Sequence, residues 1–122
     1  MGTFKVPIGV GDPEGARWER IEAYADTGAH FSAVPRPVWE ALGLRPARRV
    51  TFRMADGGTR DQDVGRCRLR VDGEDIDTLI VLGEADSPCI LGALAMEGLL
   101  LAPDPVRKRL IPIEPVMLTA LA

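Results

Sequence analysis

The sequence predicts an all-β fold, a small closed or partly open β-barrel with one or two short helices. Several short runs alternate apolar and polar residues, as half-buried strands do, most clearly over 66–71. Tight-turn pairs such as Asp56-Gly57 and Asp72-Gly73 separate these runs. Only two stretches, 38–42 and 93–96, have the spacing of short helices. Many short strands joined by turns favour a barrel.

The size and charge of the chain limit what it can be. Its 122 residues suffice for one small domain, 1–122, and 46% apolar with 27% charged residues is a globular composition. The net charge of -3 and a pI of about 5.1 give no sign of binding to nucleic acid or to an anionic membrane. The start has no signal-peptide core, and the richest apolar stretch, 90–102, is interrupted by Glu97 and is too short to span a bilayer.

Few residues are available for metal or thiol chemistry. Cys67 and Cys89 are the two cysteines, and their spacing does not match a metal site. His30 is the one histidine, so a Ser-His-Asp or Cys-His site would have to use it. We therefore expect no metal and no cofactor, and a reducing, cytoplasmic location is the simpler assumption.

The strands follow one another along the whole chain. They are expected at 4–10, 18–25, 49–54, 66–71, 76–82, 90–92 and 108–113. Pro7 marks the first strand as an edge or a bulge, because proline has no N–H for a ladder bond. The run 78–82 is apolar enough to be buried on both faces.

Two short helices and a tail complete the prediction. Val38, Trp39 and Leu42 share one helical face, which Gly43 ends. A second helix begins at Ala93 and stops at Gly98, after which 99–101 should pack on the core. The apolar tail, 116–122, is either a frayed end or part of a subunit interface.

A polar hairpin should stand away from the barrel. Val50, Phe52 and Met54 share one face of its first strand. Its tip, 55–59, carries Asp-Gly and Gly-Gly, and the following residues, 60–63, are too polar to be buried. The hairpin is therefore expected to project into solvent.

The stretch Asp26-Thr27-Gly28 is the strongest candidate for chemistry. It follows a strand and would hold the Asp26 carboxylate at the strand end, where backbone bonds are partly free. Gly28 would let another backbone come close. By itself the triplet favours an ordinary turn, because Asp-x-Gly triplets are common.

The setting of this triplet resembles that of the retropepsin-like aspartic peptidases. Asp26-Thr27-Gly28-Ala29 matches their Asp-Thr-Gly-Ala signature, and Ser32 and Val34-Pro35 follow at the family's spacing. Late in the chain, Ile90-Leu91-Gly92 matches the family's apolar-apolar-Gly feature. The order of hairpin, signature, Gly-rich hairpin and late glycine holds along nearly the whole chain. The ending looks like that of cellular and bacterial members, with Leu99-Leu100-Leu101, Asp104-Pro105 and Leu110.

The resemblance implies an aspartic endopeptidase that works as a homodimer. The chain carries one Asp-Thr-Gly motif, so each subunit would contribute one Asp26 across a two-fold axis. Two carboxyl groups held close together share one proton, and the pair would activate a water for attack on a peptide bond. The partners implied are a second copy of the chain and a peptide or protein substrate.

The resemblance also implies roles for individual residues. Thr27 would brace the pair of carboxylates, Gly28 would offer its carbonyl to the substrate backbone, and Ala29 would pack beneath. Gly92 would leave room behind the Asp26 turn. A mobile flap that closes over an extended peptide would consist of Met54, Ala55, Asp56, Gly57 and Gly58.

Some residues depart from the family pattern. His30 and Phe31 stand where viral members carry acidic residues, so they would line the substrate subsites with different chemistry, although His30 fits a partly exposed turn residue equally well. The expected flap is unusually polar, with Asp56 at its tip and Arg60, Asp61 and Asp63 behind it. These departures keep open a catalytically weak or inactive module that binds peptides or dimerises. An unrelated small ligand-binding barrel is the third alternative.

Overall fold

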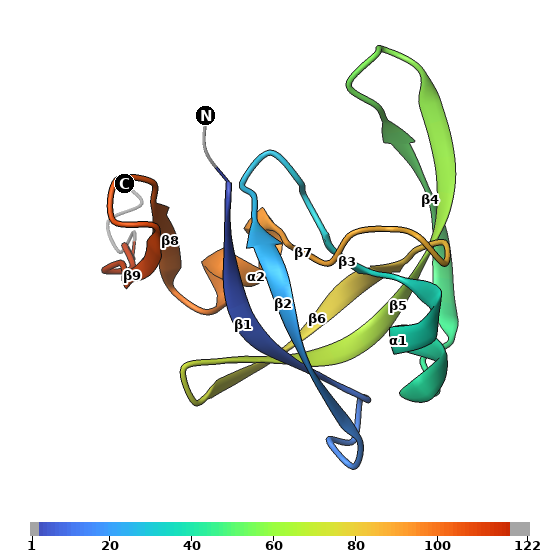
Figure 1. The fold of residues 1–122 in the computed structure, drawn as a ribbon, viewed down its shortest axis with the longest axis horizontal. Coiled ribbons are helices and arrows are strands. Elements are labelled where there is room, and N and C mark those ends of the chain that lie inside the picture. Colours follow the sequence, from blue (N-terminus) through green and yellow to red (C-terminus); the bar gives the residue numbers. More distant parts are fainter. Residues whose placement is uncertain (1–2, 118–122) are drawn as a thin grey trace, which may run out of the picture.

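The computed structural model describes residues 3–117, which form a mostly β structure with two short helices (Figure 1). The strands are β1 (Phe4–Gly11), β2 (Trp18–Ala25), β3 (Ser32–Val34), β4 (Pro46–Arg53), β5 (Thr59–Val71), β6 (Glu74–Leu82), β7 (Ile90–Leu91), β8 (Leu101–Asp104) and β9 (Arg109–Pro112). The helices are α1 (Arg36–Ala41) and α2 (Ala93–Gly98). The all-β class with two short helices is confirmed.

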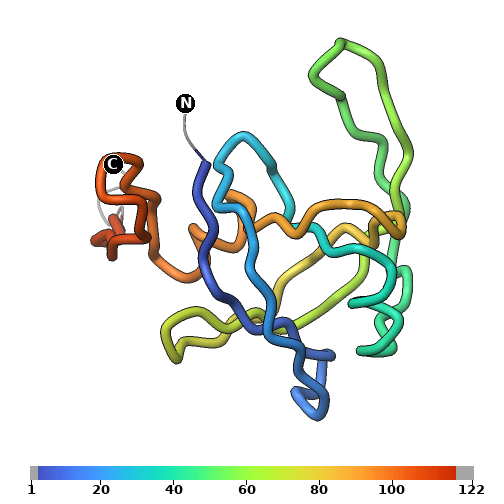
Figure 2. The backbone as a smooth tube through the Cα atoms, in the orientation of Figure 1, coloured from blue at the N-terminus to red at the C-terminus, as the bar shows by residue number. Residues whose placement is uncertain are grey.

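The main sheet closes into a barrel. Its strand order is β1-β2-β7-β3-β6-β5-β4, and β1 also pairs with β5. This extra pairing joins β1, β2, β7, β3, β6 and β5 into a ring and leaves β4 outside it. Figure 2 traces the course of the backbone through these strands. Closure removes exposed strand edges from most of the sheet.

The core follows from the alternation of side chains along the strands. Cys67, Leu69 and Val71 are buried, while the arginines between them and at 66 face outward, as predicted. In β6, Ile80 and Leu82 are buried but the residues between and before them are only half-buried. The expectation that 78–82 is buried on both faces is therefore only partly correct, because Leu79 and Val81 on the second face each line an open recess.

Pro7 lies where its missing N–H costs nothing. β1 pairs with β2 along its whole length but with β5 only over residues 9–11. The Tyr24 N–H donates to the Cys89 carbonyl and so points away from β1. Backbone groups alternate in direction along a strand, so Glu22, two residues before Tyr24 and opposite Pro7, also directs its N–H and C=O away from β1. The nitrogen of Pro7 therefore points to the open side of β1, and the edge position expected for it is confirmed.

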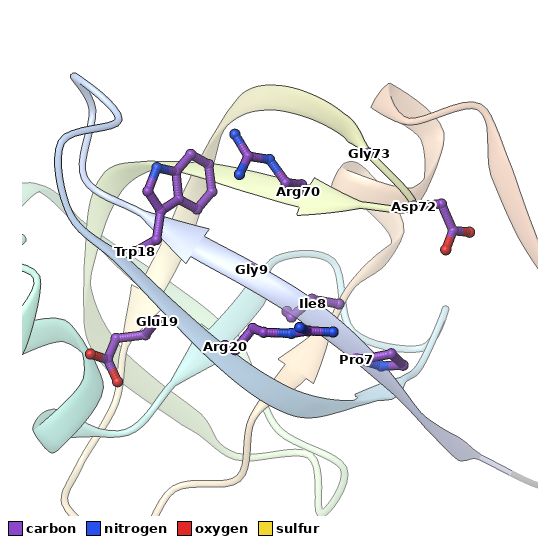
Figure 3. Close-up of a pocket in the computed structure, with 9 residues that line it drawn as sticks. All are labelled: Pro7, Ile8, Gly9, Trp18, Glu19, Arg20, Arg70, Asp72 and Gly73. Carbon is purple, nitrogen blue, oxygen red and sulfur yellow. The ribbon is translucent and has the colours of Figure 1, made fainter.

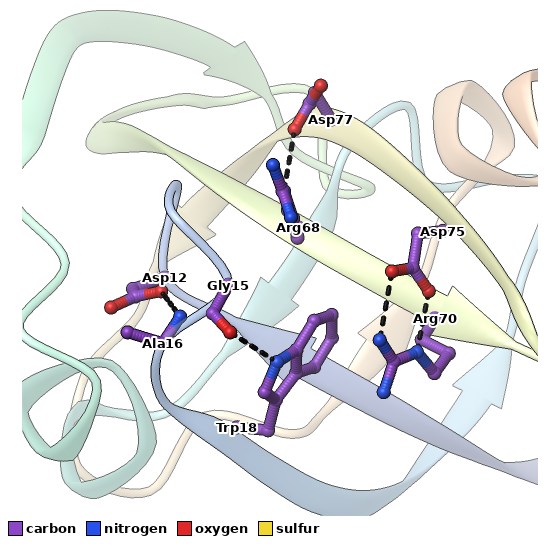
Figure 4. Close-up of polar contacts among 8 residues, drawn as sticks. All are labelled: Asp12, Gly15, Ala16, Trp18, Arg68, Arg70, Asp75 and Asp77. Atoms are coloured by element: carbon purple, nitrogen blue, oxygen red, sulfur yellow. Dashed lines mark hydrogen bonds and ion pairs between the residues drawn. The ribbon is translucent and has the colours of Figure 1, made fainter.

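Trp18 anchors the hairpin that leads to the Asp26 turn. Its indole N–H donates to the Gly15 carbonyl (2.9 Å), and the Arg70 guanidinium lies 4.1 Å from its ring centroid (Figure 4). A side chain at Gly11 would come within 2.9 Å of the indole, so this glycine makes room for it. Arg70 is held in turn by both oxygens of Asp75, at 2.6 and 2.9 Å.

A recess of about 550 Å³ lies beside Trp18 on the outer face of β1 (Figure 3). Gly9 forms part of its floor, and residues of both charge signs line it. These are Arg20, Arg70, Glu19 and Asp72. Because the charges are mixed, the recess indicates no preferred charge for a ligand.

The C-terminal part differs most from the prediction. β8 and β9 form a separate two-stranded sheet at one end of the molecule, and β8 was not predicted (Figure 1). Leu100 was expected to pack, but it is 42% exposed and adopts a left-handed conformation (φ 59°) in the turn that ends α2. Val116 and Met117 are exposed, and the rest of the predicted tail, 118–122, lies outside the described residues. Among the described residues, no helix has the length and apolar character needed to cross a membrane.

Candidate active site

The Asp26 loop, residues 26–31, is held at the end of β2 by the short strand β7. Tyr24 and Ala25 pair in parallel with Ile90 and Leu91. The ladder continues one bond further, because the Asp26 N–H donates to the Leu91 carbonyl at 3.0 Å. The backbone of Asp26 is thus fixed by the barrel while its half-buried side chain lies at the strand end.

The Asp26 carboxylate is oriented by its own turn. Its Oδ1 accepts a hydrogen bond from the Gly28 N–H at 2.9 Å, and its carbonyl accepts one from Ala29 at 3.2 Å. This is the side-chain turn that aspartate favours after a strand. A side chain at Gly28 would lie 3.1 Å from Oδ1, so the glycine allows this close contact.

Helix α2 supports the loop from behind. The N–H groups of Ala93 and Leu94 donate to the carbonyls of Ala29 (2.8 Å) and His30 (3.0 Å). These donors are free at the first turn of a helix, so the loop caps the helix and is fixed by it. The N–H of Gly92 donates to the hydroxyl of Ser32 at 3.0 Å, and Ser32 is buried.

Gly92 permits this packing. A Cβ at this position would lie 2.6 Å from the carbonyl carbon and oxygen of Phe31 and 2.9 Å from the carbonyl oxygen of Ala29. Backbone atoms cannot move aside as the end of a flexible side chain can. A residue larger than glycine would therefore clash with the backbone of the Asp26 loop at this position.

A recess of about 730 Å³ opens between the Asp26 loop and the β4–β5 hairpin. The loop contributes Gly28, Ala29, His30 and Phe31, and the hairpin contributes Val50, Phe52, Met54, Ala55 and Gln62, among others. The barrel wall contributes Ala33, Val81 and Ile90, and the loop before β7 contributes Gly83, Ser87 and Pro88. In Figure 1 the hairpin stands away from the barrel, as predicted.

The structure brings together only part of the predicted site. Gly28, Ala29, His30, Phe31, Met54 and Ala55 line the recess, and Asp26 and Gly92 lie in or behind the loop that forms one wall. Asp56, Gly57 and Gly58 do not line it, because they form the exposed turn at the hairpin tip. Thr27 is exposed and is also not part of the lining. The catalytic and binding roles of all these residues remain predictions.

The hairpin tip is a hydrogen-bonded turn. Met54 donates its N–H to the Gly58 carbonyl at 2.8 Å, and Gly57 donates to the Met54 carbonyl at 3.0 Å. Asp56 accepts from the Gly58 N–H at 2.9 Å, which repeats the geometry of Asp26 and Gly28. Gly57 has a φ of 90°, which only glycine adopts easily.

Sequence reasoning missed most of the recess walls. Gln62 was grouped with residues too polar to be buried, yet it is half-buried and lines the recess. It pairs with Val50 across the hairpin, so it shares the inner face with Val50 and Phe52. Counting the alternation back from the hairpin tip would have placed Gln62 on this face.

Side chains that commonly bind metal ions do not cluster among the described residues. Within residues 3–117, no group of three or more His, Cys, Asp or Glu side chains is placed to hold a metal ion.

Comparison with solved structures identifies the fold. EIAV protease complexed with the inhibitor HBY-793 superposes with a TM-score of 0.59 at 16% identity, over 80% of this chain and 88% of that one. The chain has the retropepsin-like fold. The solution structure of simian foamy virus (mac) protease matches with a TM-score of 0.53 at 19% identity, over 80% of this chain and 99% of that one.

A third match gives the same result within a larger protein. The foamy viral protease-reverse transcriptase in complex with an RNA/DNA hybrid matches with a TM-score of 0.55 at 13% identity, over 93% of this chain and 13% of that one. No family model matches the sequence, and no curated protein matches it either. At such low identities, the structural likeness establishes the fold and not the activity.

Proposed function

We propose that the protein is an aspartic endopeptidase that acts as a homodimer. The observation that carries this proposal is the position of Asp26. It lies on a turn that is fixed by β7 and α2, beside a recess that the β4–β5 hairpin borders on the other side. The retropepsin-like fold supports the same conclusion. The C-terminal sequence, with Leu99-Leu100-Leu101 and Asp104-Pro105, favours a cellular or bacterial member over a viral one.

The proposed chemistry needs two carboxyl groups. When two such groups lie close together, one holds a proton that the other lacks. The ionised group takes a proton from a water molecule, which attacks the peptide carbonyl carbon, and the protonated group donates to the carbonyl oxygen. Collapse of this intermediate breaks the C–N bond and returns a proton to the leaving amine. The pair titrates as one unit.

The second carboxyl group has to come from a second copy. The chain has a single Asp-Thr-Gly, and Thr27 and Gly28 next to Asp26 are exposed, so the turn is accessible to a partner. Large apolar side chains are also exposed toward the C-terminal end, namely Leu100, Ile113, Val116 and Met117. Such side chains are suited to an interface between subunits.

The proposed substrate is an extended peptide in the recess, covered by the β4–β5 hairpin. Backbone groups of the hairpin tip and of Gly28 would bind the peptide main chain, and the recess would take its side chains. We also propose a reducing, cytoplasmic location, which fits the two free cysteines, Cys67 and Cys89.

The proposal is tested by comparing wild type with Asp26→Asn on a mixed peptide library. The asparagine keeps the oxygen that accepts from Gly28, so the fold and the dimer should survive while proton transfer is lost. Cleavage is read by mass spectrometry from acid to neutral pH at high protein concentration. Cuts made only by wild type are expected. No cuts, or the same cuts from both proteins, would favour the peptide-binding or dimerisation module instead.

A further inference from the structure

The walls of the recess beside Asp26 carry aromatic side chains. Phe31 and Phe52 face each other edge to face, with ring centroids 5.7 Å apart, and both line the recess. His30 lies edge to face against Phe31 at 5.1 Å on the exposed rim. Aromatic rings attract a further ring in the same edge-to-face geometry. These walls therefore favour an aromatic guest over an aliphatic one.

Small residues form part of the lining of the recess. Ala29 and Ala33 line it together with Gly28 and Gly83, and the opening has a volume of about 730 Å³. Small residues opposite large ones leave space that only a large side chain fills. A small guest such as alanine would leave the aromatic walls in contact with water.

Several polar side chains line the recess, and Gln62 is the one that shares the inner face of the hairpin with Val50. Gln62 lines the recess, is half-buried, and forms no side-chain hydrogen bond with the residues that the structure describes. Its amide can both donate and accept. Ser87, in the loop before β7, also lines the recess and accepts from the Glu84 N–H at 2.8 Å, a bond that does not use its hydroxyl proton.

Charged groups around the recess are already occupied or face elsewhere. The Arg53 guanidinium donates to the Gly57 carbonyl at 2.8 Å, and Arg49 pairs with Asp63 at 3.0 Å on the outer face of the hairpin. A cationic guest would lie near the Arg53 charge, and an anionic guest would pair with Arg53 only if Arg53 left its bond to the Gly57 carbonyl. A neutral polar tip is the chemistry that matches Gln62.

We propose that this recess selects a tyrosine side chain of the substrate, and that Gln62 is the residue that distinguishes tyrosine from phenylalanine. The inference rests on the proposed function, because it names the side chain that the peptidase accepts. The tyrosine ring packs against Phe31 and Phe52, and its hydroxyl exchanges a hydrogen bond with the Gln62 amide. A binding site that forms a hydrogen bond with a substrate hydroxyl rejects the analogue without that hydroxyl, because the polar group of the site then has no partner.

The test uses peptide pools in which one position at a time is fixed as Tyr, Phe, Ala or Glu and the others are random. Wild type is compared with Gln62→Leu and with Gln62→Met, which removes the amide but keeps the side-chain length. Arg66→Leu is the matched control, because it makes a polar-to-apolar change at an exposed position of the same strand that does not line the recess. Wild type and the control should prefer Tyr over Phe at one position by about 3- to 10-fold, the effect of one neutral hydrogen bond. Both Gln62 variants should lose this preference.

A second measurement separates this inference from the proposed hydrolysis. Binding of the same pools to Asp26→Asn is measured with and without the Gln62→Leu change. In one outcome, wild type fails to cleave while Asp26→Asn binds the tyrosine pools and loses this binding when Gln62 is replaced. That result supports selection of tyrosine by the recess and shows that the proposed hydrolysis is wrong. If wild type cleaves without preferring tyrosine, or if the Gln62 variants keep the preference, the recess inference is overturned and hydrolysis stands. Absence of both cleavage and tyrosine-selective binding overturns both.

Discussion

Phe31 and Phe52 connect the Asp26 loop to the β4–β5 hairpin. Their rings meet edge to face, with centroids 5.7 Å apart and an interplanar angle of 81°. Phe31 belongs to the loop that begins at Asp26, and Phe52 lies near the end of β4, just before the hairpin tip. A movement of the hairpin therefore alters a contact of the loop that carries the candidate catalytic carboxylate.

This contact should be measurable as a coupling in stability. In a double-mutant cycle with Phe31→Leu and Phe52→Leu, we expect the two free-energy losses to differ from additivity by about 0.5–1.5 kcal/mol, the usual value for an aromatic pair. Urea unfolding of the four proteins gives the coupling energy. Phe31→Leu combined with Trp18→Phe, on the outer face of the barrel, should be additive. Additivity in the Phe31–Phe52 cycle would show that the two rings do not interact in solution.

Gly92→Ala should destabilise the protein and displace the Asp26 loop. The new methyl group would lie 2.6 Å from the Phe31 carbonyl, in a loop whose neighbouring carbonyls, those of Ala29 and His30, are bonded to α2. We expect a loss of about 1–3 kcal/mol in the free energy of unfolding, together with a loss of any activity. Gly98→Ala is the matched control, because its methyl group would only touch Ile76 Cδ1 at 3.4 Å. Equal stability of the two variants would contradict the packing described behind the loop.

Local patterns explain why much of the fold is predictable from the sequence. The alternation over 66–71 places Cys67, Leu69 and Val71 in the core, and the structure agrees. Glycine and aspartate pairs mark the hairpin tips at Asp56-Gly57 and Asp72-Gly73, where φ is 90° at Gly57 and 51° at Asp72. These features depend on neighbours in the chain, so one sequence is enough to identify them.

Features that depend on distant residues were not predictable in the same way. The three-residue strand β3 is too short to show a pattern, and it forms because β6 and β7 supply its partners. The local alternation gives the face of Gln62, but the recess that it lines is completed by the Asp26 loop, which lies far away in the sequence. Leu100 is exposed because the end of α2 turns there in a left-handed conformation, which hydrophobicity alone does not reveal.

Cys67 should make stability sensitive to alkaline pH. Burial, together with the nearby charge of Asp77, raises the pKa of its thiol from 9.0 to about 12. Above pH 9 the unfolded thiol ionises while the folded one stays protonated, so the unfolded state gains stability as the pH rises. We expect the free energy of unfolding to fall by about 1 kcal/mol from this group by pH 10.

Urea unfolding at several pH values checks this expectation. Cys67→Val removes the thiol and should flatten the decline between pH 8 and pH 10. An unchanged decline in this variant would show that Cys67 is not its source. A thiol reagent at neutral pH should also modify the half-buried Cys89 in preference to the buried Cys67.

Mixing wild type with Asp26→Asn should suppress activity, because the proposed site needs one intact carboxyl group from each subunit. If the two kinds of chain exchange freely, a roughly ninefold excess of the variant leaves about a tenth of the wild-type chains paired with one another. Activity per wild-type chain should then fall about tenfold, provided that the mixture is incubated long enough for subunits to exchange. An equal mass of serum albumin in place of the variant should have no effect. Unchanged activity after subunit exchange has been verified would mean that one Asp26 is enough, and the shared pair of carboxyl groups would have to be abandoned.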